Sequence, residues 1–550
     1  MNSLVAELSH RAADCYLGIA QVKAHDREEN LRRAIEAYEK ALRFFSADSY
    51  RLRNAEIQNN LGIAFSELAD IRDREANLTR AISLFDLNLS VFSLDAFPFE
   101  YGRAQMNLGR SLGALADVRD KEANLKRCIA AFKKALQVFT FETSPEPYAM
   151  TMNNLGSACA SLADVRDKEA NLNDSVAAYR KALRVYTLTN FPQEYGVTQN
   201  NLGNSFRHLA QVRDIETYLK QSIEAYSEAL RVRTIREFPF DYAMTQNNLG
   251  NAYQSLAEVR DKTANLNRAV AAYREALRVR TYDAFPQAYA RTQGNLGNAY
   301  GELAEQRDKE SNLQQAIEAH REALRVFTLE AFPQDYAKSQ NNLGNSYVAL
   351  SEVKNKEANL GQAIAAYYEA LRVRTFEAFP QDYALTQTNL GNVYAALAEF
   401  QDKERNLERA IAACLQALRV RTFEDLPQDY AKTVNNLGSA YGALADVRDR
   451  EINLNMAVDA FREGLRVLSF ENFPEKYAST QMNLGLALSQ LARVRLQSNA
   501  TEEAIDFIKA SRKCLEEALR YFTSESNPSM HRTLIENVRG IDAWLQALAV

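Results

Sequence analysis

The chain has 550 residues, of which 46% are hydrophobic and 25% are charged, and its formal net charge is −5. Dedicated binders of nucleic acid or of anionic membranes are usually basic, so this composition argues against both classes of partner. The five cysteines form no C-x-x-C pair, which predicts a reducing, cytoplasmic environment rather than a disulfide framework. The first residues lack the pattern of a secretion signal, and no apolar run is long enough to predict a membrane span.

Leu-Gly dipeptides divide the chain into repeats. The first repeat is shorter than the others, because Gly18 stands 44 residues before Gly62, and every later step is 47 residues. Prolines follow the same step from Pro98 to Pro474. The repeat glycines are Gly18, Gly62, Gly109, Gly156, Gly203, Gly250, Gly297, Gly344, Gly391, Gly438 and Gly485. The sequence therefore contains eleven repeats of one structural unit.

Each repeat predicts two helices, as residues 286–328 illustrate. Pro286 suits a first helical turn, and apolar residues then recur at spacings of three and four as far as Leu303. Asp308 follows, and Asp or Asn holds this position in nine repeats, which predicts a side-chain N-cap for the second helix. The second helix carries its apolar residues on one face between Leu313 and Val326.

A helical hairpin with one apolar side needs neighbours that cover it, so the repeats predict an all-α stack. The eleventh repeat contains about seven extra residues, or roughly two helical turns, which predicts a longer second helix. Residues 528–548 have one apolar face and predict a final helix that caps the stack. The expected organisation is eleven tandem hairpins over residues 1–527 and a C-terminal capping helix over residues 528–550.

The order of residues within each repeat resembles the signature of the tetratricopeptide repeat family. In the sixth repeat the matching residues are Leu249, Gly250, Tyr253, Ala269, Tyr273 and Ala276. The repeats are longer than the usual 34 residues, and they look like the elongated repeats of kinesin light chains and of bacterial or fungal signalling proteins. The resemblance implies a right-handed superhelical solenoid whose first helices line a concave groove that holds a polypeptide.

Asparagines predominate at the positions that the resemblance places in the groove. Two residues before the glycine, the candidate binding residues are Asn154, Asn201, Asn248, Asn295, Asn342, Asn389 and Asn436. One residue after it, they are Asn204, Asn251, Asn298, Asn345 and Asn392. Three residues before it, Asn59, Asn153, Asn200, Asn247, Asn341 and Asn435 extend the set. A row of amides either binds the backbone of an extended chain or bridges neighbouring helices, and the sequence leaves both interpretations open.

Other groove positions vary from repeat to repeat. Arg207 and His208 replace the small residues that occupy this place elsewhere, and they are candidates to bind a carboxylate. Six residues before the glycine, Met150 and Met244 are apolar, whereas Arg291, Lys338 and Lys432 are basic. This gradient predicts a ligand with apolar residues toward the fourth to sixth repeats and acidic residues toward the later ones; freely varying surface positions are the alternative.

Three further patterns have a chemical and a structural interpretation. Recurrent Arg-x-Arg pairs, such as Arg231 and Arg233, could follow a phosphate backbone, but helix-end cations paired with acids are the expected explanation. Repeated Asp-Lys-Glu segments suggest capping rather than catalysis. Cys128, Cys159 and Cys414 replace Ala or Tyr and are expected to be buried thiols.

The sequence thus predicts a scaffold or sensor-adaptor subunit and no enzyme. It contains no nucleophile–base arrangement, metal motif or phosphate-binding loop, and no cofactor is expected. Two alternatives remain: regulation of a separately encoded effector, such as a caspase-like protease, and self-association through the C-terminal helix. The expected partner is a protein or extended peptide with acidic residues, or an effector enzyme subunit; nucleic acid is disfavoured and membrane excluded.

Overall fold

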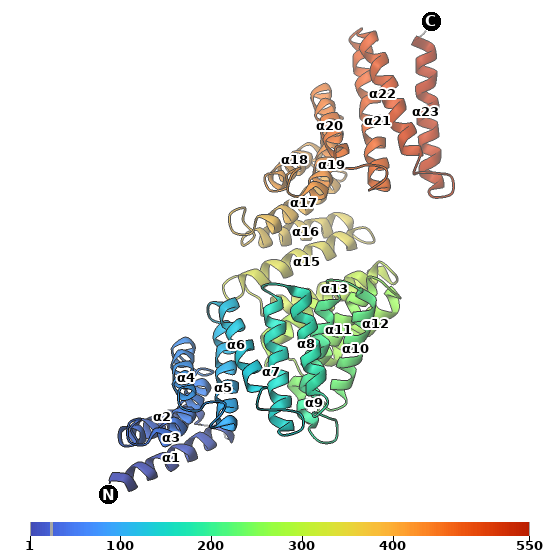
Figure 1. Ribbon diagram of the computed structural model, residues 1–550. Helices are drawn as coiled ribbons and strands as arrows, with labels where there is room; N and C mark the ends of the chain where they lie inside the picture. Colours follow the sequence, from blue (N-terminus) through green and yellow to red (C-terminus); the bar gives the residue numbers. More distant parts are fainter. Residues whose placement is uncertain (1, 23–25, 549–550) are drawn as a thin grey trace. The chain divides into compact units, whose positions relative to one another are not determined.

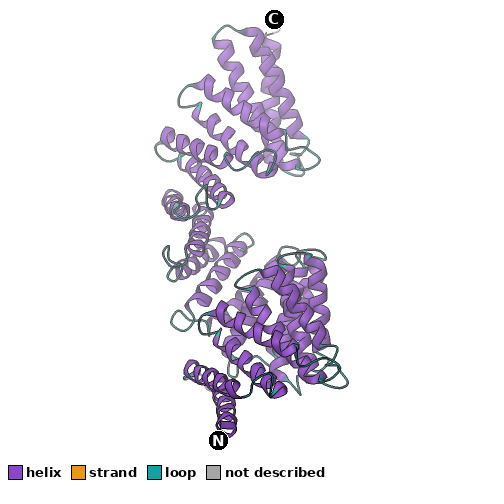
Figure 2. Cartoon of the chain, turned by 60° about the vertical axis from the view of Figure 1, so that its left-hand side comes forward, coloured by secondary structure: helices purple, strands orange, loops and turns teal. Residues whose placement is uncertain are grey.

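The computed structural model describes residues 2–22 and 26–548, and every regular element within these ranges is an α-helix (Figure 1, Figure 2). The predicted segments 1–527 and 528–550 therefore include residues 1, 23–25 and 549–550, which lie outside the described residues. The helices fall into two compact units, Met1–Val279 and Arg280–Val550. No helix in the described part of the chain is long and apolar enough to cross a membrane.

The first unit holds twelve described helices. They are α1 (Asn2–Val22), α2 (Arg27–Phe44), α3 (Arg51–Leu68), α4 (Arg74–Leu89), α5 (Pro98–Ala116), α6 (Lys121–Ala135), α7 (Pro145–Ala163), α8 (Lys168–Ala182), α9 (Pro192–Leu209), α10 (Ile215–Leu230), α11 (Pro239–Ala257) and α12 (Lys262–Leu277).

The second unit holds eleven described helices. They are α13 (Pro286–Ala304), α14 (Lys309–Leu324), α15 (Pro333–Ser351), α16 (Lys356–Leu371), α17 (Pro380–Leu397), α18 (Lys403–Leu418), α19 (Pro427–Leu444), α20 (Arg450–Leu465), α21 (Pro474–Gln497), α22 (Thr501–Leu519) and α23 (Pro528–Leu548).

Within each unit the helices pack in chain order. The two helices of a hairpin contact each other extensively, and each hairpin then contacts the first helix of the next. In the second unit α23 packs against α22, and the three helices α21, α22 and α23 lie side by side in Figure 1. The prediction of an all-α fold built from repeated helical hairpins is confirmed.

Proline and the aromatic residue before it start most of the first helices. Pro286 occupies the first turn of α13, and Phe285 before it has a non-helical backbone, with φ −142° and ψ 64°. The backbone N–H of Tyr289 donates to the carbonyl of Phe285 at 2.8 Å, which closes the first turn. Proline fits this place because its missing N–H would have no partner in the first turn of a helix.

The start of the second helix differs from the prediction. Asp308 does not cap α14 with its side chain; it has a left-handed backbone with φ 47°, as do its counterparts in the other repeats. Asp and Asn tolerate this conformation better than other residues with a side chain. The capping expectation was wrong because the position selects for backbone conformation.

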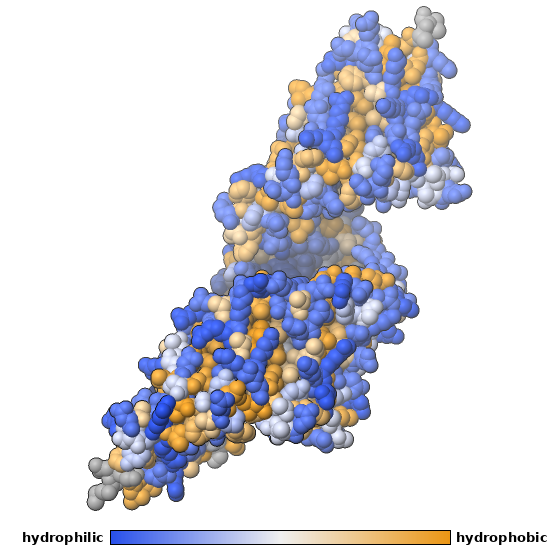
Figure 3. Space-filling view, viewed as in Figure 1, coloured by the Kyte–Doolittle hydropathy of each residue, from blue (hydrophilic) through white to orange (hydrophobic). Residues whose placement is uncertain are grey.

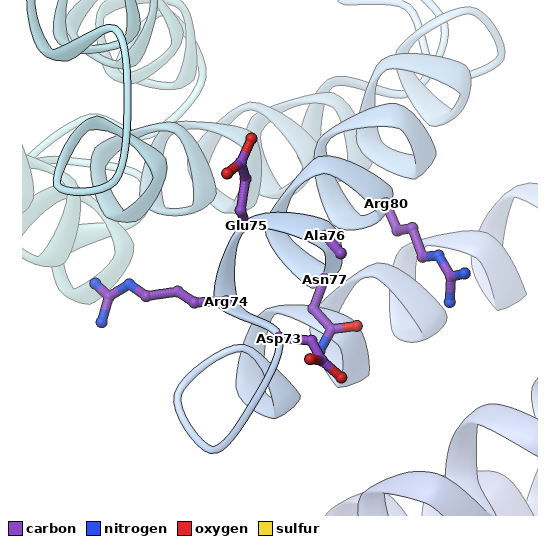
Figure 4. Close-up of a pocket in the computed structure, with 6 residues that line it drawn as sticks. All are labelled: Asp73, Arg74, Glu75, Ala76, Asn77 and Arg80. Carbon is purple, nitrogen blue, oxygen red and sulfur yellow. The ribbon is translucent and has the colours of Figure 1, made fainter.

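The residue four places after this aspartate stabilises the turn instead, and it is an asparagine in most repeats. Asn312 donates from Nδ2 to the carbonyl oxygen of Arg307 at 2.8 Å, and Asn77 donates to Arg72 at 2.9 Å. In Figure 4 Asp73 and Asn77 lie together at the start of α4, whereas the Arg74 side chain projects away from them. An asparagine inside the helix thus satisfies the last carbonyl of the turn.

A glycine-to-ring contact closes most of the hairpin cores. A Cβ added to Gly250 would lie 2.5 Å from Cε1 of Tyr273, and one added to Gly344 would lie 2.6 Å from Cε1 of Tyr367. Both tyrosines are fully buried. The Leu-Gly dipeptide recurs because an aromatic ring of the second helix rests directly on the glycine backbone of the first.

The extra residues of the eleventh repeat lengthen both helices rather than the second alone. The helix α21 has 24 residues and α22 has 19, whereas α19 and α20 have 18 and 16. Buried residues Leu488 and Ile508 keep both extended helices in packed cores. Elsewhere the surface in Figure 3 mixes hydrophilic and hydrophobic residues in small patches.

Candidate functional site

Asparagine amides connect successive first helices in the second unit. The Nδ2 atom of Asn342 on α15 donates to Oδ1 of Asn298 on α13 at 3.0 Å. Asn389 donates to Asn345 in the same way at 3.2 Å, and Asn436 donates to Asn392 at 2.6 Å. We call these three pairs the amide ladder. In each pair the residue two positions before the glycine meets the residue one position after the preceding glycine.

Buried tyrosines also donate to asparagines one place after the glycine, including Asn345 of the ladder. The hydroxyl of Tyr367 donates to Oδ1 of Asn345 at 2.7 Å, and in the first unit Tyr226 donates to Asn204 at 2.6 Å. Tyr273 donates to Asn251 at 2.8 Å. Burial raises the pKa of the Tyr226 and Tyr367 hydroxyls, which keeps both protonated and therefore able to donate.

The bridging bonds leave part of each amide free. The Nδ2 atoms of Asn298, Asn345 and Asn392 donate to no group within the described residues, because their Oδ1 atoms make the contacts. Asn298 is half-buried, and Asn345 and Asn392 are exposed. The ladder therefore bridges helices and still presents oriented N–H donors, so the two interpretations of the sequence are compatible with each other.

The remaining candidate asparagines keep part of their surface exposed. All are half-buried: Asn154, Asn201, Asn248 and Asn295 two places before the glycine, and Asn204 and Asn251 one place after it. Asn248 donates to Asn200 at 3.4 Å in the first unit. Asn251 and Asn295 each make a further interaction.

The asparagines three residues before the glycine are in part buried between helices. Asn200 and Asn341 are 2% and 3% exposed and accept hydrogen bonds from Thr245 and Thr386, each at 3.2 Å, on the next first helix. They bridge helices inside the stack. Asn153, Asn247 and Asn435 at the same position are half-buried, as are the candidates two places before the glycine.

Arg207 and His208 contact each other. Nη2 of Arg207 lies 3.1 Å from Nε2 of His208, and the Nε atom of Arg207 is buried without a hydrogen-bond partner. Burial, and then the adjacent guanidinium, lower the pKa of His208. The histidine is therefore neutral near pH 7, and the positive charge of the pair resides on Arg207.

The residues six places before the glycine are accessible. Met150 is exposed and Met244 is half-buried. Arg291, Lys338 and Lys432 are exposed, and none of the three forms an ion pair within the part of the chain that the structure describes. The second unit thus carries three solvated cations at equivalent places on α13, α15 and α19.

The Arg-x-Arg pairs do not form a surface stripe. The first member is exposed and bonds the residue three places earlier, which is a glutamate in most pairs, as Glu369 is for Arg372 at 2.8 Å, and Gln416 for Arg419. The second member is buried: Arg374 is 8% exposed and donates to Thr386 at 3.1 Å. This arrangement favours the structural interpretation and removes half of the cations from reach of a phosphate backbone.

The described His, Cys, Asp and Glu side chains lack the arrangement that a metal site requires. No group of three His, Cys, Asp or Glu side chains that could hold a metal ion occurs among the described residues. Burial raises the pKa of Cys128 and Cys414 to about 12 and that of Cys159 to about 11, so these thiols stay protonated and unreactive.

A cavity of about 660 Å³ lies beside the ladder, between α13, α14 and α15. Asn298, Asn342 and Asn345 line it, together with Gly301 and His320. The sequence pattern singled out Gly301 as a small residue and His320 as a packed ring, but it did not predict a cavity. The signal available in the sequence was His320 itself, because most other repeats have Tyr or Phe at the equivalent position of the second helix.

No protein-family model matches the chain, and no curated protein matches it. Among solved structures it is similar to apo RapI, with 14% identity over 74% of this chain and 97% of that chain and a TM-score of 0.42. It is also similar to a TPR repeat-containing protein from Cytophaga hutchinsonii (14% identity, 58% and 98% coverage, TM-score 0.36) and to BtubC from P. vanneervenii (20%, 46% and 90%, 0.33). These low values establish neither a family nor a function.

Proposed function

We propose that the chain is a non-enzymatic scaffold that holds an extended polypeptide along the amide ladder. The observation that carries the proposal is the set of free Nδ2 donors on Asn298, Asn345 and Asn392, each held in place by a bond to the same residue's Oδ1. Donors fixed before binding lose little conformational entropy when a ligand arrives. Backbone carbonyls of an extended chain are suitable acceptors, whatever its side chains.

The cations of the second unit support a ligand with acidic residues. Arg291, Lys338 and Lys432 occupy the same register on their helices and are exposed without an ion-pair partner in the described ranges. Such rim charges contribute mainly to association rate and specificity, whereas the oriented donors contribute to retention. The proposed ligand is therefore an acidic segment of a partner protein, bound through its backbone.

The experiment replaces the free donors and keeps the bridging acceptors. The combined variant Asn298→Asp, Asn345→Asp and Asn392→Asp retains an oxygen for Asn342, Asn389, Asn436 and Tyr367, but it removes the three Nδ2 groups. A control with Gln306→Glu, Gln314→Glu and Gln362→Glu adds the same charge at exposed positions outside the ladder. The probe is a random peptide library selected on the full chain.

The proposal expects enriched peptides to lose about tenfold or more in affinity for the ladder variant and little for the control, because hydrogen-bond donors are lost only from the first. Circular dichroism must show equal helix content in all three proteins. Failure to enrich any peptide, or equal affinity for the wild type and the ladder variant, would overturn the proposal.

A further inference from the structure

One buried arginine of the second unit lacks the acid that its counterparts have. Three arginines at the second place of Arg-x-Arg pairs lie near an aspartate in the first turn of the next helix: Arg233 near Asp241 at 3.9 Å, Arg374 near Asp382 at 3.4 Å and Arg421 near Asp429 at 3.8 Å. Arg280 is as buried as they are, at 7% exposed, but Ala288 stands at the aspartate's place in α13. Arg280 consequently forms no ion pair with any described residue.

The guanidinium of Arg280 is nevertheless held as in the other repeats. Its Nη1 donates to Oγ1 of Thr292 at 2.9 Å, and Arg374 makes the equivalent bond to Thr386 at 3.1 Å. This is the only hydrogen bond of Arg280 within the described ranges. Its Nη2, the atom that lies near the aspartate in the other repeats, is therefore left without an acceptor.

A second cation adds to the positive charge at this place. Arg291 on α13 is exposed and has no ion-pair partner in the described part of the chain. Burial, and then repulsion by the Arg291 guanidinium, lower the pKa of Arg280 to about 10, so Arg280 keeps its charge near pH 7. Because a buried charge without a counter-ion is unfavourable, an anion at the place of the missing aspartate would be stabilised.

The place of the missing carboxylate is open to solvent. The side chains of Asp382 and Asp429 are each 51% exposed, although both lie beside a buried arginine. Ala288 at the equivalent place is itself half-buried. A carboxylate from another molecule can therefore approach Nη2 of Arg280 from solvent while the hairpin stays packed.

This place lies on the same face of α13 as the amide ladder. Arg291 follows Ala288 by three residues and Asn298 follows Arg291 by seven, which is the spacing of one helical face. Ten residues of helix are about 15 Å long, and about five residues of extended chain span that distance. A polypeptide bound at Asn298 can therefore bring a nearby side chain to Arg280.

We propose that Arg280 binds the carboxylate of an aspartate or glutamate side chain of the polypeptide that the ladder holds, at the place that Ala288 leaves open. The carboxylate accepts from Nη2 of Arg280, and the exposed guanidinium of Arg291 attracts it from the solvent side. This inference rests on the proposed function and assigns the site of the ligand's essential acidic residue.

Ala288→Asp tests the site because it supplies the missing carboxylate from the chain itself. Aspartate already holds this place in α11, α17 and α19. A carboxylate in the first turn of a helix is also favourable, so the variant should fold at least as stably as the wild type. The matched control is Gln287→Asp, which adds the same charge at the exposed neighbouring residue.

The probes are the peptides enriched on the wild-type chain, each also made with its aspartates and glutamates replaced one at a time by asparagine or glutamine. We expect one acidic residue per peptide to be essential, with its replacement and Ala288→Asp each weakening binding about tenfold or more. The two losses should not add, because both remove the same contact. Gln287→Asp should bind as the wild type does.

The outcomes separate the two proposals. If enriched peptides lose affinity for the ladder variant but bind Ala288→Asp normally, or tolerate every neutral replacement, the carboxylate site is refuted while the scaffold stands. If no peptide is enriched, or the ladder variant binds normally, the scaffold is refuted and the assignment of its ligand's acidic residue falls with it.

Inorganic phosphate distinguishes a free anion from a carboxylate of the partner. The carboxylate site is also overturned, in favour of a free anion, if phosphate protects the wild type but not Ala288→Asp against thermal unfolding while the peptides tolerate neutral replacement.

Discussion

The seventh and eighth hairpins, α13–α14 and α15–α16, have the same helix lengths of 19 and 16 residues and the same amide-ladder bonds to a neighbour. They differ where the ring of the second helix meets the first. In the eighth hairpin Tyr367 fills the space and bonds Asn345, whereas in the seventh His320 and Gly301 leave it open. The stacking contacts therefore do not need a filled core at this place.

The largest expected effect comes from adding one methyl group to each glycine under the ring. Gly344→Ala puts Cβ 2.6 Å from Cε1 of Tyr367, which is confined, so we expect a loss of about 3 kcal/mol of local stability. Gly297→Ala meets His320 at the same 2.6 Å, but that ring can shift into the cavity that it lines, and we expect about 1 kcal/mol. Hydrogen exchange of the two hairpins measures both values. Equal losses would mean that the cavity lined by His320 leaves its ring no space to move into.

An intermediate effect follows from pH. The folded pKa of His320 is about 4, below its ordinary value of 6.5, so between these values the unfolded chain binds more protons than the folded one. Stability is thus complete above pH 6.5 and falls as the pH is lowered toward 4. We expect the seventh hairpin to lose about 2 kcal/mol between pH 7 and pH 5.

Urea denaturation at both pH values tests this, with His320→Tyr as the reference that lacks the titrating ring. The difference in pH dependence between the two proteins is the measured quantity. An identical dependence in both would show that His320 is solvated and charges freely in the folded state.

The smallest effect is expected at the open glycine. Gly301→Ala adds a methyl group where no atom lies within 4 Å, so we expect only the gain in helix propensity, up to about 1 kcal/mol. Hydrogen exchange in α13 measures it, and Gly297→Ala in the same helix is the destabilised counterpart. A loss of stability at Gly301 would show that the cavity is closed in solution.

Periodicity alone was sufficient to predict the helices. Proline, glycine and the spacing of apolar residues each reflect a requirement of one helix or of its packing within the hairpin. Pro286 starts α13 and Gly297 lies under a ring, as the pattern of two helices in each repeat requires. The role of Asp308 was not predictable in the same way, since a side-chain cap and a left-handed backbone both favour aspartate.

The candidate site was predictable in its residues and not in its contacts. The sequence identified Asn298 and Asn342 as separate groove positions, but their mutual bond depends on how far neighbouring helices are displaced, which no single repeat encodes. The buried position of Arg374 was hidden for a similar reason, because its partner Thr386 belongs to the next helix. The sequence pattern of a repeat reflects the packing within one hairpin, whereas the contacts of the site form between two neighbouring hairpins.

The constant spacing of the ladder bonds has a consequence for how such a chain can change length. Each bond joins residues 44 positions apart, as between Asn298 and Asn342, and the repeat step is 47. Deleting one full period, such as residues 333–379, would bring Asn389 to the place of Asn342 and allow the same bond to Asn298. Gain or loss of whole periods thus lengthens or shortens the row of amides without any compensating substitution, and the length of polypeptide it accommodates changes in fixed increments.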